Sequence, residues 1–349
     1  MTGIVRDRRY LDHDPGSYHP ESPRRLEAIY TILDGEDMRD RFVSVESRFA
    51  TRDEIAMNHS AWYVDLVAGT AGKRHASLDV DTQTSPRSYE TALLAAGGFL
   101  NAVERVAAGE LRNAFALVRP PGHHAEADGA AGFCIFNNIA IGARLALKKL
   151  RMERVLIVDW DLHHGNGTQH SFYTEPRVLY FSTHQYPFYP GTGRIAEIGS
   201  RDGLGYTINV PLPRGPGDGE YVRIYRQILE PVAHAYRPDL VLLSAGFDIY
   251  RKDPLGGMNL SVPGFASLTR ILMNIADACC DGRFVITLEG GYNIDGQAQG
   301  VKAVLKEMRN DTMVSEDFLA RLDNESDRRS IDPIIQKVIE QIKPLWQVF

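Results

Sequence analysis

Acidic and histidine side chains that could bind a metal ion stand close together in segment 155–167. Four apolar residues come first, and Asp159, Asp161 and His163 follow them at alternate positions. Residues two apart in an extended chain point to the same side, so Asp161 and His163 could hold one ion. A strand that merely ends in solvated acids is the alternative, but so many ligand types in so short a segment are hard to explain as packing. The segment therefore predicts a metal site.

A third ligand is expected from Asp248, which follows an apolar run ending at Leu243. If this run is a strand parallel to the first, both strands present their carboxyl ends at the same edge of the sheet. Three protein ligands, Asp161, His163 and Asp248, leave an open coordination position, as catalytic zinc sites do. Oxygen and nitrogen ligands also suit iron, cobalt or manganese, but zinc is the ion that we expect.

Proton transfer could be carried out by His123 and His124, a tandem pair in a loop rich in glycine and proline. Histidine gains and loses protons near neutral pH, so it could take a proton from water beside the metal. An isolated histidine pair is more often structural, but here the pair would adjoin the metal site. Tyr292 follows two glycines, and its hydroxyl could donate to a developing oxyanion; a packed aromatic side chain is the alternative.

Alternating strands and helices would position these residues. Apolar runs typical of buried strands lie at 115–118, 155–158, 178–181, 206–210, 240–243 and 284–288, and helical periodicity lies at 88–108, 139–150, 220–236 and 263–279. This alternation predicts an α/β fold with a mostly parallel sheet and helices on both faces. No linker or internal repeat divides residues 1–349, so a single domain is expected.

Two of the predicted helices carry further information. The helix over 88–108 contains Gly97 and Gly98, which predict close packing against a neighbour because glycine inside a helix is otherwise costly. Near the end of the chain, Asp332 and Pro333 are expected to begin a helix over about 332–343. Its apolar stripe is expected to dock on the body of the protein, and binding of a partner is the alternative. The stripe consists of Ile334, Ile335, Val338, Ile339 and Ile342.

Composition excludes several classes of protein. The chain has 349 residues, of which 44% are hydrophobic and 24% charged, enough for a large core. A net charge of −6 gives no general affinity for nucleic acid. The three cysteines fit no disulfide framework, and the charged N-terminus lacks the apolar segment of a signal peptide, so a cytoplasmic location is expected. The sequence contains no apolar run of about 18 residues, so no membrane span is expected.

Seven segments together resemble the histone deacetylase superfamily, most closely its class II and bacterial deacetylase-like branch, which is related to acetylpolyamine amidohydrolases. The segments are 119–124, 132–138, 159–168, 190–193, 244–248, 253–256 and 288–293, within a likeness that runs from about 19 to 293. The resemblance implies an arginase-like α/β fold around an eight-stranded sheet. It also implies zinc-dependent hydrolysis of the amide of an acylated primary amine. Acetyl-lysine in a protein or peptide is the expected substrate, with an acetylpolyamine or another small acyl amide as alternatives.

Roles for individual residues follow from the same resemblance. Zinc would be held by Asp161, His163 and Asp248, with His124 as general base, His123 as its electrostatic or acid partner, and Tyr292 polarising the acyl oxygen. Arg25 matches an arginine that lines an internal product channel, and Gly132, Phe133, Tyr189 and Leu255 match the acyl-lysine tunnel and its rim. A structural potassium ion would lie at Asp159, Ser182 and Thr183 with backbone oxygens of Asp161 and His163, and a second at Phe172, Glu175, Val178 and Tyr206.

Two positions distinguish branches of this superfamily. Asn166 stands where class I members carry an aspartate, which agrees with class II. Leu255 stands where polyamine-selective relatives often carry a glutamate that meets a distal cation, so the uncharged side chain favours acetyl-lysine. The sequence says nothing about oligomeric state and is compatible with a homo-oligomer.

Three other functions are disfavoured. An arginase-like binuclear manganese hydrolase needs acids at two positions that are occupied here by Gly165 and Tyr250. A catalytically silent acyl-lysine or polyamine binding protein would be expected to have lost a metal-binding or proton-transfer residue, and all are present. A nucleotide-binding oxidoreductase would need a G-x-G-x-x-G turn after a strand, and none occurs.

Overall fold

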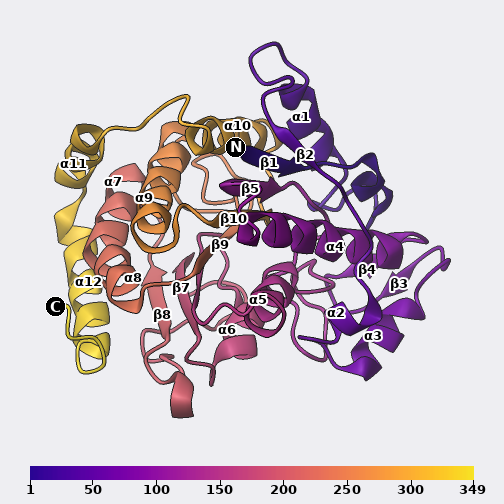
Figure 1. Cartoon of the computed structure of the whole chain (residues 1–349), viewed down its shortest axis with the longest axis horizontal. Helices are drawn as coiled ribbons and strands as arrows, with labels where there is room; N and C mark the ends of the chain where they lie inside the picture. Colours follow the sequence, from indigo (N-terminus) through magenta and orange to yellow (C-terminus); the bar gives the residue numbers. More distant parts are fainter.

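The computed structural model describes all 349 residues, and its central feature is one eight-stranded sheet (Figure 1). Across the sheet the strands are β2 (Val43–Val45), β1 (Thr2–Val5), β5 (Asn113–Ala116), β10 (Phe284–Leu288), β9 (Leu240–Ala245), β6 (Val155–Asp159), β7 (Val178–Gln185) and β8 (Thr207–Leu212). Every neighbouring pair is parallel. The inner strands are buried on both faces, which explains their continuous apolar runs. The expected fold class is confirmed.

Helices cover both faces of the sheet, which runs diagonally between them in Figure 1. One layer contains α4 (Ser88–Ala107), α5 (Asn138–Lys148) and α6 (Asn166–Phe172). The opposite layer contains α1 (Arg24–Leu33), α7 (Asp218–Ile224), α8 (Glu230–Tyr236), α9 (Val262–Cys280) and α10 (Ile294–Met308). All the strands share one direction, so the loops at their carboxyl ends meet at one edge of the sheet.

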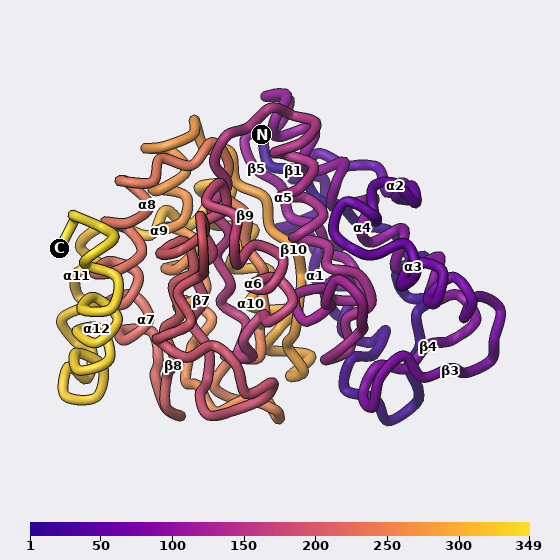
Figure 2. The backbone as a smooth tube through the Cα atoms, turned by 90° about the horizontal axis from the view of Figure 1, so that it is seen from below, coloured from indigo at the N-terminus to yellow at the C-terminus, as the bar shows by residue number.

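Smaller elements lie at the two ends of the molecule, which Figure 2 shows well separated. One end holds α2 (Arg52–Ile55), α3 (Ala61–Ala68) and the antiparallel pair β3 (Ala76–Ser77) and β4 (Gln83–Thr84). The other holds α11 (Glu316–Glu325) and α12 (Arg328–Ile342). No helix has both the length and the apolar run that a bilayer crossing requires.

Close packing of α4 is found where its two glycines predict it. A Cβ atom on Gly97 would lie 2.0 Å from the backbone oxygen of Arg48, and one on Gly98 would lie 2.4 Å from the Tyr10 hydroxyl. Neither position has room for a side chain, so the glycines let α4 approach the segment around Arg48.

The C-terminal helix begins four residues earlier than expected. Helix α12 starts at Arg328 because the side chain of Asp327 accepts a hydrogen bond from the backbone N–H of Arg329, capping the helix upstream of Pro333. The proline therefore lies inside the helix, where it has no N–H to donate to the carbonyl of Arg329. Ile335, Val338 and Ile342 are buried, and the helix packs against β8 and α7.

Two other elements differ from the sequence expectation. Strand β7 continues to Gln185 instead of ending at residue 181, because residues 182–185 pair with 209–212 of β8. Ser182, Thr183 and His184 are therefore strand residues and not loop residues. The helix expected over 220–236 is continuous, but Tyr225–Leu229 forms a π-helical turn between α7 and α8.

Candidate active site

Residues from four neighbouring strands meet at the carboxyl edge of the sheet. Asp161 and His163 follow β6, and Asp248 follows β9, the strand beside it. His123 and His124 follow β5, and Tyr292 follows β10, which lies between β5 and β9. The parallel sheet thus brings together segments far apart in the sequence.

The three expected metal ligands form one compact group. His163 Nδ1 lies 3.1 Å from Asp161 Oδ1 and 3.0 Å from Asp248 Oδ2. Ligand atoms from the three residues all lie within 4.8 Å of one another, and both carboxylates are buried. Their roles as ligands remain predictions.

The chemistry of this group fits a divalent cation. Burial and the neighbouring carboxylate of Asp161 raise the pKa of Asp248, because two negative charges are disfavoured there without a counter-ion. Two carboxylates and an imidazole match the ligands that zinc prefers. Gly290 allows the close approach, since a Cβ atom there would lie 2.6 Å from Asp248 Oδ2 and 2.7 Å from Asp161 Oδ2.

The tandem histidines have opposite electrostatic surroundings. His123 Nδ1 lies 3.1 Å from Asp159 Oδ2. Burial opposes a positive charge on His123, but Asp161 and Asp159 outweigh it and raise the pKa to about 10. The two carboxylates therefore favour the cationic form of His123 at neutral pH.

His124 is held in the neutral form. Burial and the neighbouring positive charge of His123 hold the pKa of His124 well below its usual range. Its Nδ1 lies 2.7 Å from Asn166 Oδ1, which can only accept a hydrogen bond. Nδ1 therefore carries the proton, and Nε2 keeps the lone pair that a general base needs.

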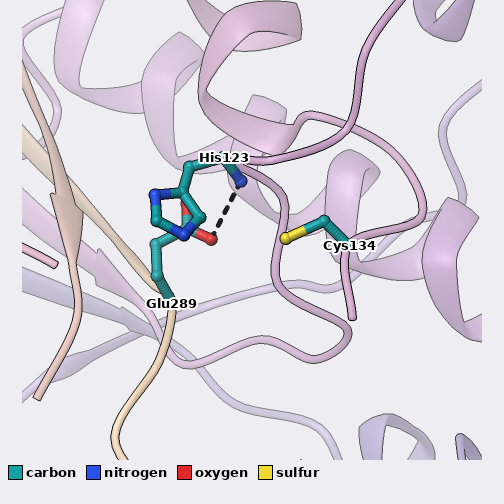
Figure 3. Close-up of side chains that lie close together, drawn as sticks. All are labelled: His123, Cys134 and Glu289. Atoms are coloured by element: carbon teal, nitrogen blue, oxygen red, sulfur yellow. Dashed lines mark hydrogen bonds between the residues drawn. The ribbon is translucent and has the colours of Figure 1, made fainter. Parts of the chain in front are cut away.

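Behind His123 lies a second buried group that sequence reasoning did not interpret (Figure 3). Figure 3 shows the side chains of Glu289 and Cys134 converging beside His123, with the sulfur atom pointing towards the carboxylate. Glu289 Oε2 accepts hydrogen bonds from the backbone N–H groups of Gly122 at 2.7 Å and His123 at 3.2 Å, and Oε1 accepts one from Ser244 at 3.0 Å. Glu289 thus orients the histidine loop, and with both oxygens occupied it is a poor candidate for a second metal ligand.

Aromatic side chains surround the approach to the metal group. The ring centroid of Tyr189 lies 5.2 Å from that of His124, and Phe188 stacks on His163 at 5.6 Å. Phe133 packs against Tyr292 at 5.9 Å. Gly132 lies directly against His124, since a Cβ atom would sit 2.2 Å from the imidazole ring. Gly132, Phe133 and Tyr189 thus lie beside His124 and Tyr292, and their role in a tunnel remains a prediction.

Tyr292 is oriented by its backbone and by Arg25. Asp253 Oδ2 accepts the backbone N–H of Tyr292 at 2.6 Å, and the Arg25 guanidinium lies 5.2 Å from the centre of the tyrosine ring. Arg25 also donates to the backbone oxygen of Gly291 at 2.7 Å. Burial raises the pKa of Tyr292 well above its usual value, and Asp248 and Asp161 add to this effect, so the hydroxyl keeps its proton.

Other expected site residues lie farther from the metal group. Leu255 is 37% exposed and lies in the loop after β9, where its backbone N–H donates to Asp253. For the first potassium site, Asp159 and Ser182 are register partners on β6 and β7, and Thr183 follows on β7. The second potassium group lies at the opposite, amino-terminal edge of the sheet: Phe172, Glu175, Val178 and Tyr206.

Asp81 is a further site residue that sequence reasoning missed. Its Oδ1 accepts the backbone N–H of Gly132 at 3.0 Å, so the loop before β4 fixes the backbone of an expected tunnel residue. Nothing in the sequence marks it, because residues 79–82 form a polar turn with no motif of their own.

Comparison with known proteins gives the family. The model of the histone deacetylase domain matches residues 19–308. A probable deacetylase of Archaeoglobus fulgidus is 42% identical over 298 residues, which make up 85% of this chain and 82% of that protein. Histone deacetylase 5 of Arabidopsis thaliana is 40% identical over 89% of this chain, and histone deacetylase clr3 of Schizosaccharomyces pombe is 39% identical over 83%. The chain spans only 49% and 45% of the lengths of these two eukaryotic proteins.

A solved structure supports the same assignment. The crystal structure of the HDA15 HD domain matches with a TM-score of 0.91 at 36% sequence identity, and the match covers 99% of this chain and 96% of that one. Likeness in sequence and in fold thus extends over the same site and nearly the whole sheet, and the resemblance noted in the sequence is confirmed: this chain belongs to the histone deacetylase family.

Proposed function

We propose that the protein is a zinc-dependent deacetylase that hydrolyses the amide of an acylated primary amine, with acetyl-lysine in a protein or peptide as its substrate. The observation that carries this proposal is the pairing of a three-residue metal group with two adjacent histidines, of which His123 favours the cationic form and His124 the neutral form. Family membership supports it, since the matched relatives are named deacetylases. Binding alone would not need a cationic and a neutral histidine side by side.

The protein's own residues would divide the chemistry among them. Asp161, His163 and Asp248 would hold the zinc ion, which when bound supplies a Lewis acid that polarises the acyl oxygen and activates water. His124 Nε2 takes a proton from the attacking water and returns it to the leaving amine nitrogen. The oxygen of that water becomes part of the released carboxylate, so hydrolysis yields a free amine and a carboxylic acid.

The remaining residues stabilise charge and orient the substrate. The cationic ring of His123 places positive charge beside the reacting centre, where negative charge develops on the acyl oxygen. The Tyr292 hydroxyl donates to the same oxygen. The walls formed by Phe133 and Tyr189 suit an uncharged alkyl chain such as the methylene groups of lysine.

The identity of the amine rests on the tunnel rim. Leu255, the residue expected at the rim, is 37% exposed and carries no charge, so it would offer nothing to the distal ammonium of an acetylpolyamine. We therefore propose acetyl-lysine over acetylspermidine, with acetylpolyamines and other small acyl amides as alternative substrates.

Potassium at the first expected site belongs to the same proposal. Thr183 Oγ1 is buried without a hydrogen-bond partner, as an oxygen ligand awaiting a cation would be. An ion at Asp159, Ser182 and Thr183 would brace the carboxyl end of β6, which leads to Asp161 and His163, against the neighbouring strand β7. The second potassium site has no such orphaned side chain to support it.

A metal-dependence assay tests the proposed function. The protein is purified, stripped with a strong chelator, and assayed against acetyl-lysine peptides and acetylspermidine before and after addition of zinc or cobalt. We expect no turnover in the stripped protein, recovery with metal, and preference for the peptide. Full activity in protein shown by elemental analysis to be metal-free would refute the zinc mechanism, and a wide preference for acetylspermidine would refute the choice of substrate.

A further inference from the structure

We propose that Glu126 is a positioning residue for the general base: its carboxylate fixes the amide of Asn166, and that amide in turn keeps the His124 proton on Nδ1. This inference rests on the proposed function. It assigns a task to a residue outside the metal group and outside the tunnel.

Two hydrogen bonds link Glu126 to His124 through Asn166, and a third links Glu126 to His170. His124 Nδ1 lies 2.7 Å from Asn166 Oδ1, and Asn166 Nδ2 donates to Glu126 Oε1 at 2.6 Å. His170 Nδ1 lies 2.9 Å from the same carboxylate oxygen. The chain of contacts thus runs from the buried base to a half-exposed histidine at the surface.

The donors and acceptors in this series of hydrogen bonds permit only one orientation of the Asn166 amide. An asparagine side chain has one acceptor end and one donor end, and either could face His124. A carboxylate is an acceptor only, so Glu126 binds the NH₂ end of Asn166 and leaves the oxygen to face the imidazole. If the amide were reversed, its NH₂ group would face Nδ1, and the imidazole proton would move to Nε2. Nε2 would then have no lone pair with which to take a proton from the attacking water.

The backbone of Glu126 is fixed by two hydrogen bonds. The backbone N–H of Glu126 donates to the backbone oxygen of Gly129 at 2.8 Å, and its own backbone oxygen lies 2.8 Å from His59 Nδ1. Asn166 and His170 are four residues apart on α6, so both face the carboxylate from one side of the helix. Asn166 is 8% exposed, and water has little access to replace the carboxylate as its acceptor.

A purely structural role predicts a different result. An ion pair between His170 and Glu126, both partly exposed, would contribute little to stability and nothing to the protonation pattern of His124. If Glu126 instead orients the Asn166 amide, its loss should lower kcat. Nε2 of His124 would then carry the proton in part of the molecules, while substrate binding would be unchanged.

The test compares Glu126→Met with Glu126→Gln in the zinc-loaded protein, assayed on an acetyl-lysine peptide. Methionine keeps the length of the side chain but accepts no useful hydrogen bond, and we expect kcat to fall on the order of tenfold to a hundredfold with KM within twofold, the range for losing a hydrogen bond to a charged group. Glutamine keeps an acceptor oxygen for the Asn166 NH₂ group and should restore kcat to within about threefold of wild type. Glu110→Met is the matched control, since it removes an exposed carboxylate paired with Arg105 before β5.

Repeating the test in an Asn166→Asp variant separates orientation of the Asn166 amide from any other effect of Glu126. In Asn166→Asp, either carboxylate oxygen can accept from His124 Nδ1, so no residue is needed to choose the correct end. Adding Glu126→Met to this background should cause no further loss of kcat. A loss as large as in the wild-type background would overturn the proposal, as would a Glu126→Met enzyme within twofold of wild type.

Nitrogen NMR of the histidine rings gives a reading that does not need turnover. The zinc-loaded wild type and Glu126→Gln should show His124 protonated on Nδ1, whereas Glu126→Met should show a mixture of tautomers. The signal of His124 is assigned by its disappearance in His124→Gln. An unchanged Nδ1–H form in Glu126→Met would overturn the positioning role. Absence of hydrolysis in the wild type would instead refute the proposed function and leave this measurement to decide the role of Glu126.

Discussion

At the scale of single residues, the two tandem histidines acquire different chemistry from their buried surroundings. A carboxylate faces His123, and an amide oxygen faces His124. The charges of Asp161 and Asp159 favour the cationic form of His123, whereas burial and the charge of His123 favour the neutral form of His124. The sequence shows two histidines but not these partners. Asp159 and Asn166 come next to the histidines only because β5 and β6 end at the same edge of one sheet.

Tyr292 has the most direct test at this scale. Tyr292→Phe removes the hydroxyl and keeps the ring that packs against Phe133 and under Arg25. A donor aimed at developing charge helps the transition state more than the ground state, so we expect kcat to fall on the order of 10²–10³, as for loss of one oxyanion donor. Steady-state kinetics on an acetyl-lysine peptide measure the fall.

Zinc content and thermal stability are the controls for Tyr292→Phe. Both should match wild type, because the hydroxyl is not a metal ligand. Turnover within threefold of wild type would show that the hydroxyl is not the oxyanion donor, and the turn formed by Gly290 and Gly291 would then be structural.

At the scale of elements, a buried charge cluster joins the loop before α1 to the ends of β5 and β10. Glu21 accepts hydrogen bonds from Arg119 after β5 and from Arg25 on α1. Arg25 in turn donates to Gly291 after β10. These three side chains are fully buried, so the cluster connects three elements of the site through charges that water cannot screen.

Acid stability should report on this cluster. Burial alone would raise the pKa of Glu21, but Arg119 and His13 outweigh it and hold the pKa well below its ordinary value of 4.5. A depressed folded-state pKa means that the stabilisation is complete above about pH 4.5 and is lost as the pH falls further. Glu21→Gln should lower the free energy of unfolding near neutral pH by about 3–5 kcal/mol, the cost of breaking a buried pair, and flatten its decline in acid.

Denaturant unfolding between pH 3 and pH 7, about the range over which a carboxyl group titrates, measures this effect. Glu325→Gln is the control, because Glu325 is 64% exposed beside Arg321 and its loss should leave the acid slope unchanged. Equal slopes for Glu21→Gln and wild type would show that this cluster does not contribute to the pH dependence.

Element boundaries show where sequence reasoning reached its limit. The central apolar runs were recognised because burial on both faces leaves them without polar residues. The edge strands were not: β1 has four residues and β2 has three, too few for a pattern, and the count of eight came from the family resemblance. The end of β7 was missed because its polar residues 182–185 are satisfied by β8, a tertiary contact that no local pattern shows.

At the scale of the whole molecule, the order of strands in the sheet creates the site. Strands β6 and β9 are neighbours although about eighty residues separate them in sequence, and the expected metal ligands Asp161, His163 and Asp248 follow their carboxyl ends. Sequence reasoning could predict that the ligands share an edge, because parallel strands all end there. It could not predict that β10 lies between β5 and β9, which puts Glu289 behind the histidine loop and Tyr292 before the metal group.

Because the metal group joins β6 to β9, an ion bound there should stabilise the folded protein as a whole. A ligand that binds only the folded state adds RT ln(1 + [L]/Kd), about 2.7 kcal/mol at one hundred times Kd, so Tm should rise with free zinc. Asp248→Asn is the matched variant, since its side-chain oxygen can still accept from the backbone N–H of Leu162 while one charged ligand is lost. We expect calorimetry to show a zinc-dependent rise in Tm for wild type and little or none for the variant. If both proteins gain the same increment, the ion responsible is bound elsewhere, and the assignment of Asp161, His163 and Asp248 as its ligands is wrong.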